Sequence, residues 1–206
     1  MGIHEERARA FFQGVPLARK DGREGNKMYK ETKESQWEEV VRFHGHICGG
    51  LTIGYKAASY AKKLLGIAKA ADEEVVCIAE NDACGVDAIS VVLGCTVGRG
   101  NLLFHKIGKQ AFSIYRRDTG ESVRLVLKKL PRPMDKEDAK SYYLQKMPSE
   151  LFDVKETTIP LPEKARIFRS KTCAVCQEET MEQEMISMEG QLHCKDCCKP
   201  YNRFQV

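Results

Sequence analysis

The sequence predicts an α+β protein, in which a domain of mixed helices and strands precedes a small domain organised around four cysteines. Two stretches, residues 35–48 and 51–65, repeat apolar side chains with helical spacing. Short runs between residues 102 and 130 have the composition of β-strands, and four cysteines gather between residues 173 and 197. A chain of 206 residues is long enough for one domain and a small companion.

Composition excludes several classes of protein. The chain is 42% apolar and 30% charged, with a formal net charge of +4, a balance that suits a folded globular protein. It holds no run of about 18 apolar residues that would span a membrane, and its charged N-terminus lacks the apolar core of a signal peptide. We therefore expect a cytoplasmic protein without a membrane role. Nine cysteines in such a compartment point to metal or redox chemistry rather than to disulfides.

The first helix is predicted from Ser35, which can cap it with the help of Glu38 three residues later. Its apolar face carries side chains at i, i+3, i+4, i+7 and i+11: Trp37, Val40, Val41, His44 and Cys48. A second helix follows over residues 51–65, and Gly66 has the position of a C-cap.

The middle of the chain is predicted to alternate strands with one helix. Val75–Ala79 has the composition of a strand, and the apolar run Val86–Leu93 between two glycines indicates a buried helix. Three extended runs follow, and a turn sequence at residues 118–120 would join the last two as a hairpin. These runs are Leu102–Lys106, Ala111–Arg116 and Ser122–Leu130. Cys77 and His105 fall inside predicted strands and are expected in the core.

These elements divide the chain into four parts. Residues 1–34 form an irregular lead-in, since glycines and Pro16 interrupt any period there. Residues 35–153 form the α+β core domain, which ends with a polar helix over residues 135–147. Residues 154–165, with Pro160 and Pro162, are predicted to be an extended linker, and residues 166–206 form the small C-terminal domain.

The C-terminal domain carries the most specific motif of the chain. Two Cys-x2-Cys pairs, separated by seventeen residues, have the spacing at which two turns present four thiolates to one tetrahedral zinc ion. The four cysteines are Cys173, Cys176, Cys194 and Cys197. A segment of about forty residues buries too little apolar surface to fold alone, so we expect a structural zinc. His193 is interpreted as a neighbour of the site rather than a ligand.

The charge of this domain disfavours nucleic acid as its partner. Residues 166–206 hold six basic and six acidic side chains, and four thiolates with one dication bring the total to about −2. Phosphate binding needs clustered positive charge. We therefore expect a folding module or a protein-docking element.

A second candidate site lies in the first half, where His44, His46 and Cys48 precede a Gly-Gly pair. If the first helix continues to Cys48, then His44 and Cys48 lie on one face and can share a metal, with His46 pointing elsewhere. If Gly45 ends the helix, all three can converge, and Cys48 stands at a helix N-terminus that stabilises a thiolate. The spacing alone leaves both alternatives open.

The segment at residues 79–90 contributes further candidates at a predicted strand-to-helix junction. Cys84 precedes a glycine and a helix start, so the same thiolate argument applies to it. Asp87 can orient a histidine or bind a metal directly. For Asp82, a role as a simple helix cap is an equal alternative.

These motifs resemble the FmdE family, named after formylmethanofuran dehydrogenase, over about residues 35–150. The motifs are His44-Gly-His46-x-Cys48-Gly-Gly with Gly54-Tyr55, then Asp82-Ala-Cys84-x-x-Asp87-Ala, and a glycine-rich run from Gly94 to Leu102. The resemblance implies a thioredoxin-like mixed sheet flanked by helices, followed by a treble-clef or ribbon-type zinc finger. It also implies a site, holding zinc in some members, at His44, His46, Cys48 and Cys84.

Three hypotheses about function follow. In the leading one the chain is a zinc-binding accessory protein that assists a metalloenzyme, because it lacks signatures for molybdopterin and for ferredoxin-type clusters. In the second it is an enzyme, with a catalytic zinc on His46, Cys48 and Cys84 and a coordination position left open. In the third it is an interaction module that acts through its zinc finger. We expect a homodimer.

Overall fold

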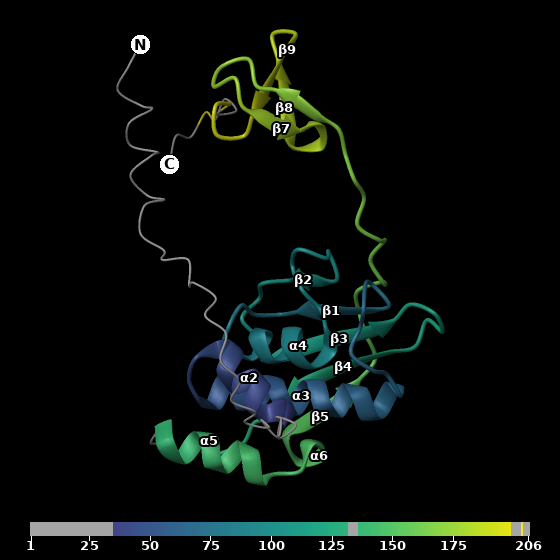
Figure 1. Cartoon of the computed structure of the whole chain (residues 1–206), viewed down its shortest axis with the longest axis vertical. Coiled ribbons are helices and arrows are strands. Elements are labelled where there is room, and N and C mark those ends of the chain that lie inside the picture. Colours follow the sequence, from purple (N-terminus) through teal and green to yellow (C-terminus); the bar gives the residue numbers. More distant parts are fainter. Residues whose placement is uncertain (1–34, 132–135, 199–202, 204–206) are drawn as a thin grey trace, which may run out of the picture. The chain divides into compact units, whose positions relative to one another are not determined.

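The computed structural model describes residues 35–131, 136–198 and 203. The predicted irregular lead-in, residues 1–34, lies outside the described residues. The first domain is built from five helices and a five-stranded sheet within the described ranges (Figure 1). Its elements, in chain order, are α2 (Gln36–His44), α3 (Gly49–Leu65), β1 (Val75–Ala79), α4 (Gly85–Leu93), β2 (Leu102–Phe104), β3 (Ala111–Arg116), β4 (Ser122–Leu127), α5 (Lys136–Gln145), α6 (Pro148–Leu151) and β5 (Phe152–Lys155).

The sheet has the strand order β2-β1-β3-β4-β5 and is mixed. Strands β1 and β2 pair in parallel, with Cys77 opposite Leu102, whereas the remaining neighbours pair antiparallel. Residues 118–120 turn β3 into β4, and Gly120 has the positive φ of 76° that such a turn requires. The predicted α+β class, with a mixed sheet and flanking helices, is confirmed.

Helices α3 and α4 cover one face of this sheet, with α2 packed against both (Figure 1). The main core lies between these layers, and its fully buried side chains include Leu51, Ile89, Phe112 and Leu125. Alternation along β1 sends Cys77 into this core and Val76 to the opposite face.

On the opposite face of the sheet, the described residues that cover it include the irregular segment after β5. Val76, Ile78 and Tyr115 form a small apolar cluster there, against which Ile159 packs. The Tyr115 hydroxyl donates a hydrogen bond of 2.6 Å to the carbonyl oxygen of Ile159. Further along, the backbone N–H of Ala165 donates to the Glu73 carboxylate at 3.1 Å. Part of the predicted linker is therefore attached to the first domain.

Three expectations differ from the structure at the ends of strands. The first concerns β4, which ends at Leu127 rather than at Leu130. Residues 154 and 155, assigned to the linker, pair with β4 as the end of β5. His105, expected in the core, is exposed, because β2 ends one residue earlier at Phe104. Cys77, by contrast, is fully buried in β1 as expected.

The C-terminal domain consists of two short antiparallel hairpins. The first pairs β6 (Ser170–Thr172) with β7 (Glu179–Met181), and the second pairs β8 (Met185–Met188) with β9 (Gln191–Cys194). A single 3-10 turn, Glu182–Glu184, joins them. Few of its described side chains are buried: Cys173, His193 and Cys198 are less than 9% exposed. Such a small domain fits the expectation that a bound metal supplies its stability.

Candidate metal centres

Two groups of side chains among the described residues bring metal-binding atoms within 4.8 Å of one another. One is the four-cysteine group, Cys173, Cys176, Cys194 and Cys197. The other, which we call the first-domain group, is His44, Cys48 and Cys84. Thiolate and imidazole are the ligands that zinc prefers, so both groups have suitable donors for a metal ion.

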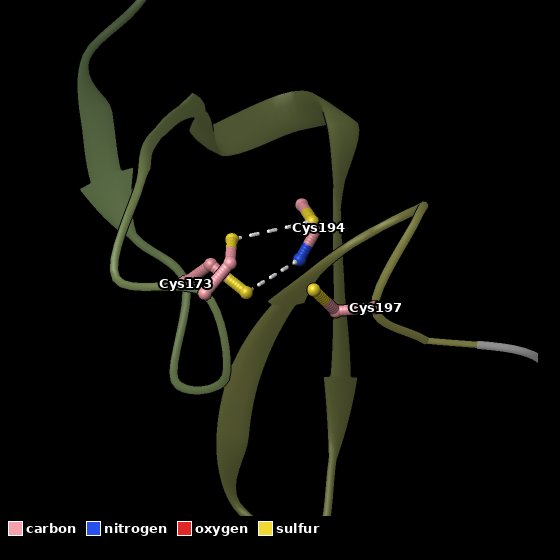
Figure 2. Close-up of side chains that lie close together, drawn as sticks. Cys173, Cys194 and Cys197 are labelled. Carbon is pink, nitrogen blue, oxygen red and sulfur yellow. Dashed lines mark hydrogen bonds between the residues drawn. The ribbon is translucent and has the colours of Figure 1, made fainter. Parts of the chain in front are cut away.

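The four-cysteine group is assembled by two tight turns (Figure 2). Cys173 and Cys176 lie in the turn between β6 and β7, where the Gln177 N–H donates to the Cys173 carbonyl at 3.0 Å. Cys194 ends β9, and the N–H of Cys197 donates back to its carbonyl at 3.1 Å. The two pairs predicted from the spacing thus meet in the structure.

The separations between these sulfurs suit one tetrahedral ion. Sulfurs bound to zinc at about 2.3 Å lie about 3.8 Å from one another. The Sγ atoms of Cys176 and Cys194 are 3.9 Å apart. The backbone N–H of Cys194 also donates to Cys173 Sγ at 3.3 Å, a contact that favours a thiolate (Figure 2). The residues present therefore fit a structural zinc.

Hydrogen bonds give the thiols of the four-cysteine group different pKa values. Backbone N–H groups, led by that of Cys194, lower the pKa of the Cys173 thiol to about 6. Hydrogen bonding with the neighbouring thiols, led by that of Cys194, raises the pKa of Cys197 to about 12. Crowded sulfurs do not all ionise together unless a cation compensates their charge. A bound metal cation would supply that compensation.

His193 lies outside the four-cysteine group although it precedes Cys194 in β9. Its side chain is 7% exposed, and its Nδ1 atom has no hydrogen-bond partner in the described part of the chain. Cys198, the remaining cysteine of this domain, is also buried, with its sulfur 3.9 Å from that of Met188.

The first-domain group is built at three helix ends. His44 is the last residue of α2, which Gly45 terminates in the left-handed conformation with φ at 89°. Cys48 is the N-cap of α3, and its Sγ accepts the N–H of Leu51 at 3.3 Å. Cys84 is the N-cap of α4. Gly45 ends the helix, as in the second alternative for this motif, but His46 does not converge with His44 and Cys48 as that alternative expected.

The two thiols meet because α3 and α4 approach closely at glycines. A Cβ atom added to Gly54 would lie 2.1 Å from the carbonyl oxygen of Gly85, so no side chain fits at this crossing. A Cβ atom on Gly50 would lie 3.9 Å from the sulfurs of both Cys48 and Cys84. Glycine at position 54 lets the two helices approach so closely, whereas the space beside Gly50 would accept a Cβ atom in ordinary contact.

Asp87 orients the imidazole of His44. Its Oδ2 atom lies 2.7 Å from His44 Nδ1, while His44 Nε2 lies 4.0 Å from the sulfur of Cys48. When Nδ1–H donates to Asp87, the Nε2 atom carries the free lone pair and lies toward the sulfur of Cys48. A carboxylate behind a histidine in this way fixes the tautomer and raises the basicity of a metal ligand.

Cys84 differs from the expectation of an acidic thiol at a helix N-terminus. Burial raises its pKa, and hydrogen bonding with Cys48 raises it further. The backbone of Cys84 is helical rather than extended, and its side chain makes no capping hydrogen bond. Desolvation is thus the largest influence on the pKa of this thiol, and it favours the protonated form.

His46 is the predicted site residue that the structure leaves outside the group. His44, rather than His46, lies with Cys48 and Cys84 in the group whose ligand atoms are within 4.8 Å of one another. His46 is exposed, and its ring lies 4.5 Å from that of His44, measured between centroids. The spacing did not distinguish the two histidines, because their directions depend on the backbone between α2 and α3 and on the contact of His44 with Asp87.

A cavity of about 460 Å³ opens beside the first-domain group. His44, Cys84 and Asp87 line it, together with apolar residues that sequence reasoning did not nominate. These are Val86, Val97, Leu102 and Phe104. Asp82 also lines the cavity, and its carboxylate binds Lys106 at 3.0 Å.

Comparison with known proteins identifies the family of this chain and a solved structure with the same fold. The family model described as "FmdE, Molybdenum formylmethanofuran dehydrogenase operon" matches residues 43–186, more than half of the chain. The chain belongs to the FmdE family. A solved structure, that of a tungsten formylmethanofuran dehydrogenase FmdE-like protein from Syntrophus aciditrophicus, shares the fold. It has a TM-score of 0.61 and 24% identity, over 80% of this chain and 92% of that one.

A curated relative gives a different name. A protein of Archaeoglobus fulgidus, called "Probable S-adenosyl-L-methionine-binding protein", is 28% identical over 171 residues. The match covers 68% of this FmdE-family chain but 47% of the relative, so the chain spans about half the relative's length. Among the described helices, none is long and apolar enough to cross a membrane.

Proposed function

We propose that this FmdE-family protein is a zinc-binding accessory protein with two different zinc sites. The four-cysteine group holds a structural zinc with no position left for another ligand. The first-domain group holds a zinc with three protein ligands, His44, Cys48 and Cys84, and one position free for a water or a ligand. The observation that carries the proposal is the cavity, because His44 and Cys84, two of these three donors, line its open space.

The residues around the first-domain group have separate roles in this proposal. Cys48 supplies a thiolate that the Leu51 N–H stabilises, and Asp87 holds His44 in the ligating tautomer. Cys84 completes the set when its proton leaves, which makes metal binding dependent on pH. A zinc with an open position exchanges ligands more readily than the closed four-cysteine site, which suits a protein that handles metal for another enzyme.

The proposed partner is a metalloenzyme of the kind that gives the family its name. The sequence holds no signature of a redox cofactor, so an accessory role accounts for its two metal groups with the fewest assumptions. The proposal also includes a cytoplasmic location for the protein and its association as a homodimer.

Metal content tests the two sites separately. Mass spectrometry on anaerobically purified protein is expected to give two zinc equivalents for wild type and one each for Cys48→Ala and Cys173→Ala. Cys198→Ala, which removes a buried cysteine outside both groups, is the matched control and should keep two. One equivalent in wild type, retained in Cys48→Ala and lost in Cys173→Ala, would overturn the first-domain zinc.

The cavity also favours a second candidate, a zinc-dependent enzyme. A zinc with an open position polarises a carbonyl or acidifies a bound water. S-Adenosyl-L-methionine is the first small molecule to test, because it is in the name of the relative from Archaeoglobus fulgidus. Calorimetric binding to wild type that is lost in Cys48→Ala would support a ligand at this site; equal binding to both proteins would place it elsewhere.

A further inference from the structure

The cavity beside the first-domain group has two contrasting sides. One side carries the polar groups of His44, Cys84 and Asp87. The other is formed by Val86, Val97, Leu102 and Phe104. Val97 is 64% exposed and Phe104 is 38% exposed, so apolar surface faces solvent next to the metal-binding atoms. Exposed apolar surface inside a concavity is typical of a ligand site.

The charges around the cavity restrict what its ligand can carry. Within the described lining, the Asp82 carboxylate binds the Nζ atom of Lys106 at 3.0 Å, so this pair is neutral. Zinc with the two thiolates of Cys48 and Cys84 and a neutral imidazole is also neutral. The Asp87 carboxylate then leaves a net charge of about −1 beside the cavity, which repels an anionic group on a ligand.

Resting on the proposed first-domain zinc, we propose that this cavity binds a small ligand with one metal-binding head group and an uncharged, apolar body. The head group occupies the open coordination position. The body lies along Val97 and Phe104, whose exposed surface it covers. Phosphorylated or carboxylated bodies are disfavoured, because the described lining offers no uncommitted cation to receive them.

Three hydroxamates that share a head group test this proposal on the full chain. They are acetohydroxamate, benzohydroxamate and 4-carboxybenzohydroxamate, titrated against the Co²⁺-substituted protein with the visible absorption of the metal as the signal. Benzohydroxamate is expected to bind at least about tenfold more tightly than acetohydroxamate, because its ring buries apolar surface. The carboxylated ring should lose most of that gain.

Variants separate the proposal from the zinc site on which it rests. Val97→Asp should weaken benzohydroxamate about tenfold and leave acetohydroxamate unchanged. Val154→Asp makes the same change at a valine of β5 that is 50% exposed and lies outside the cavity, and it should alter neither. Cys48→Ala should abolish every spectral response to the hydroxamates while the closed four-cysteine site keeps its cobalt.

The outcomes distinguish two failures. Absence of a Cys48-dependent cobalt signal would overturn the zinc site itself. A normal signal with equal affinity for the three hydroxamates, or an equal loss of all three in Val97→Asp, would leave the metal site standing and overturn the proposed ligand class.

Discussion

At the scale of single residues, Asp87 is the group whose removal tests the first-domain site without removing a ligand. Asp87→Asn keeps the shape of the side chain but no longer holds the Nδ1–H of His44 through a charge. We expect metal affinity at this site to fall about 10- to 100-fold, the usual effect of losing a carboxylate behind a histidine ligand. Competition with a chromophoric chelator measures the change.

Asp82→Asn is the matched control for that variant. Asp82 lines the same cavity, but its carboxylate binds Lys106 rather than His44. The metal affinity of this variant should remain within about twofold of wild type, since exposed ion pairs contribute little. If both variants lost affinity equally, the charge of the cavity rather than the orientation of His44 would be responsible.

Glu80 is a buried carboxylate with an effect on stability that depends on pH. Its side chain is 4% exposed, and Arg124 binds it through two hydrogen bonds of 2.5 and 2.8 Å. These bonds hold the pKa of Glu80 below its usual value. The pair therefore contributes stability above the unfolded pKa of about 4.3, which is lost as the pH falls through the folded pKa.

Glu80→Gln removes this dependence. The difference in free energy of unfolding between wild type and variant should be largest near pH 7 and shrink below about pH 4. Urea denaturation between about pH 7 and pH 3 measures it, with Glu156→Gln, an exposed glutamate, as control. A difference that stays constant with pH would refute the titration of Glu80 as its source.

At the scale of elements, the crossing of α3 and α4 determines whether Cys48 and Cys84 can meet. Gly54→Ala would place a Cβ atom 2.1 Å from a backbone oxygen of α4, so the helices must separate. We expect a loss of about 1–3 kcal/mol of stability and the loss of the first-domain metal. Denaturation and metal analysis of one preparation measure both effects. Gly98→Ala, where a Cβ atom meets nothing within 4 Å, should change neither.

Elements with local signals were predictable from sequence, and those defined by distant pairing were not. The capping box of Ser35 and Glu38 and the left-handed Gly66 mark helix ends as expected, because these signals lie within one turn of the chain. Strand β5 escaped prediction, since its four residues become a strand only through pairing with β4. Asp87 was expected to orient a histidine or to bind a metal directly, but its partner His44 lies 43 residues away, so no local signal could choose between these roles or between the histidines.

The two candidate metal groups also differ in how far they could be predicted from local sequence signals. That the four cysteines of the C-terminal domain come together was predictable, because the Cys-x2-Cys spacing alone indicates two tight turns. In the first domain the residue types pointed to the site, but only the structure shows that His44, held by Asp87, joins the two cysteines while His46 does not. The apolar side of the cavity, with Val97 and Phe104, had no sequence signal, because isolated apolar residues in loops and strands are common.

At the scale of the whole molecule, the two domains should respond differently to metal removal. The first domain buries a continuous core, whereas the described part of the C-terminal domain buries few side chains. A strong chelator is therefore expected to abolish hydrogen-exchange protection in residues 170–198 and to preserve it in β1, β3 and β4. Hydrogen exchange read by mass spectrometry resolves these segments. Protection that persists in residues 170–198 after complete metal loss would contradict a structural zinc.

The strand order has a consequence for self-association. The sheet ends in β2 and β5, which are three and four residues long, so each edge offers few free backbone groups to another chain. Short edges discourage both fibrillar aggregation and dimers formed by extending one sheet into the next. The homodimer that we expect should therefore form through helices or loops, and peptides that copy β2 or β5 should fail to dissociate it.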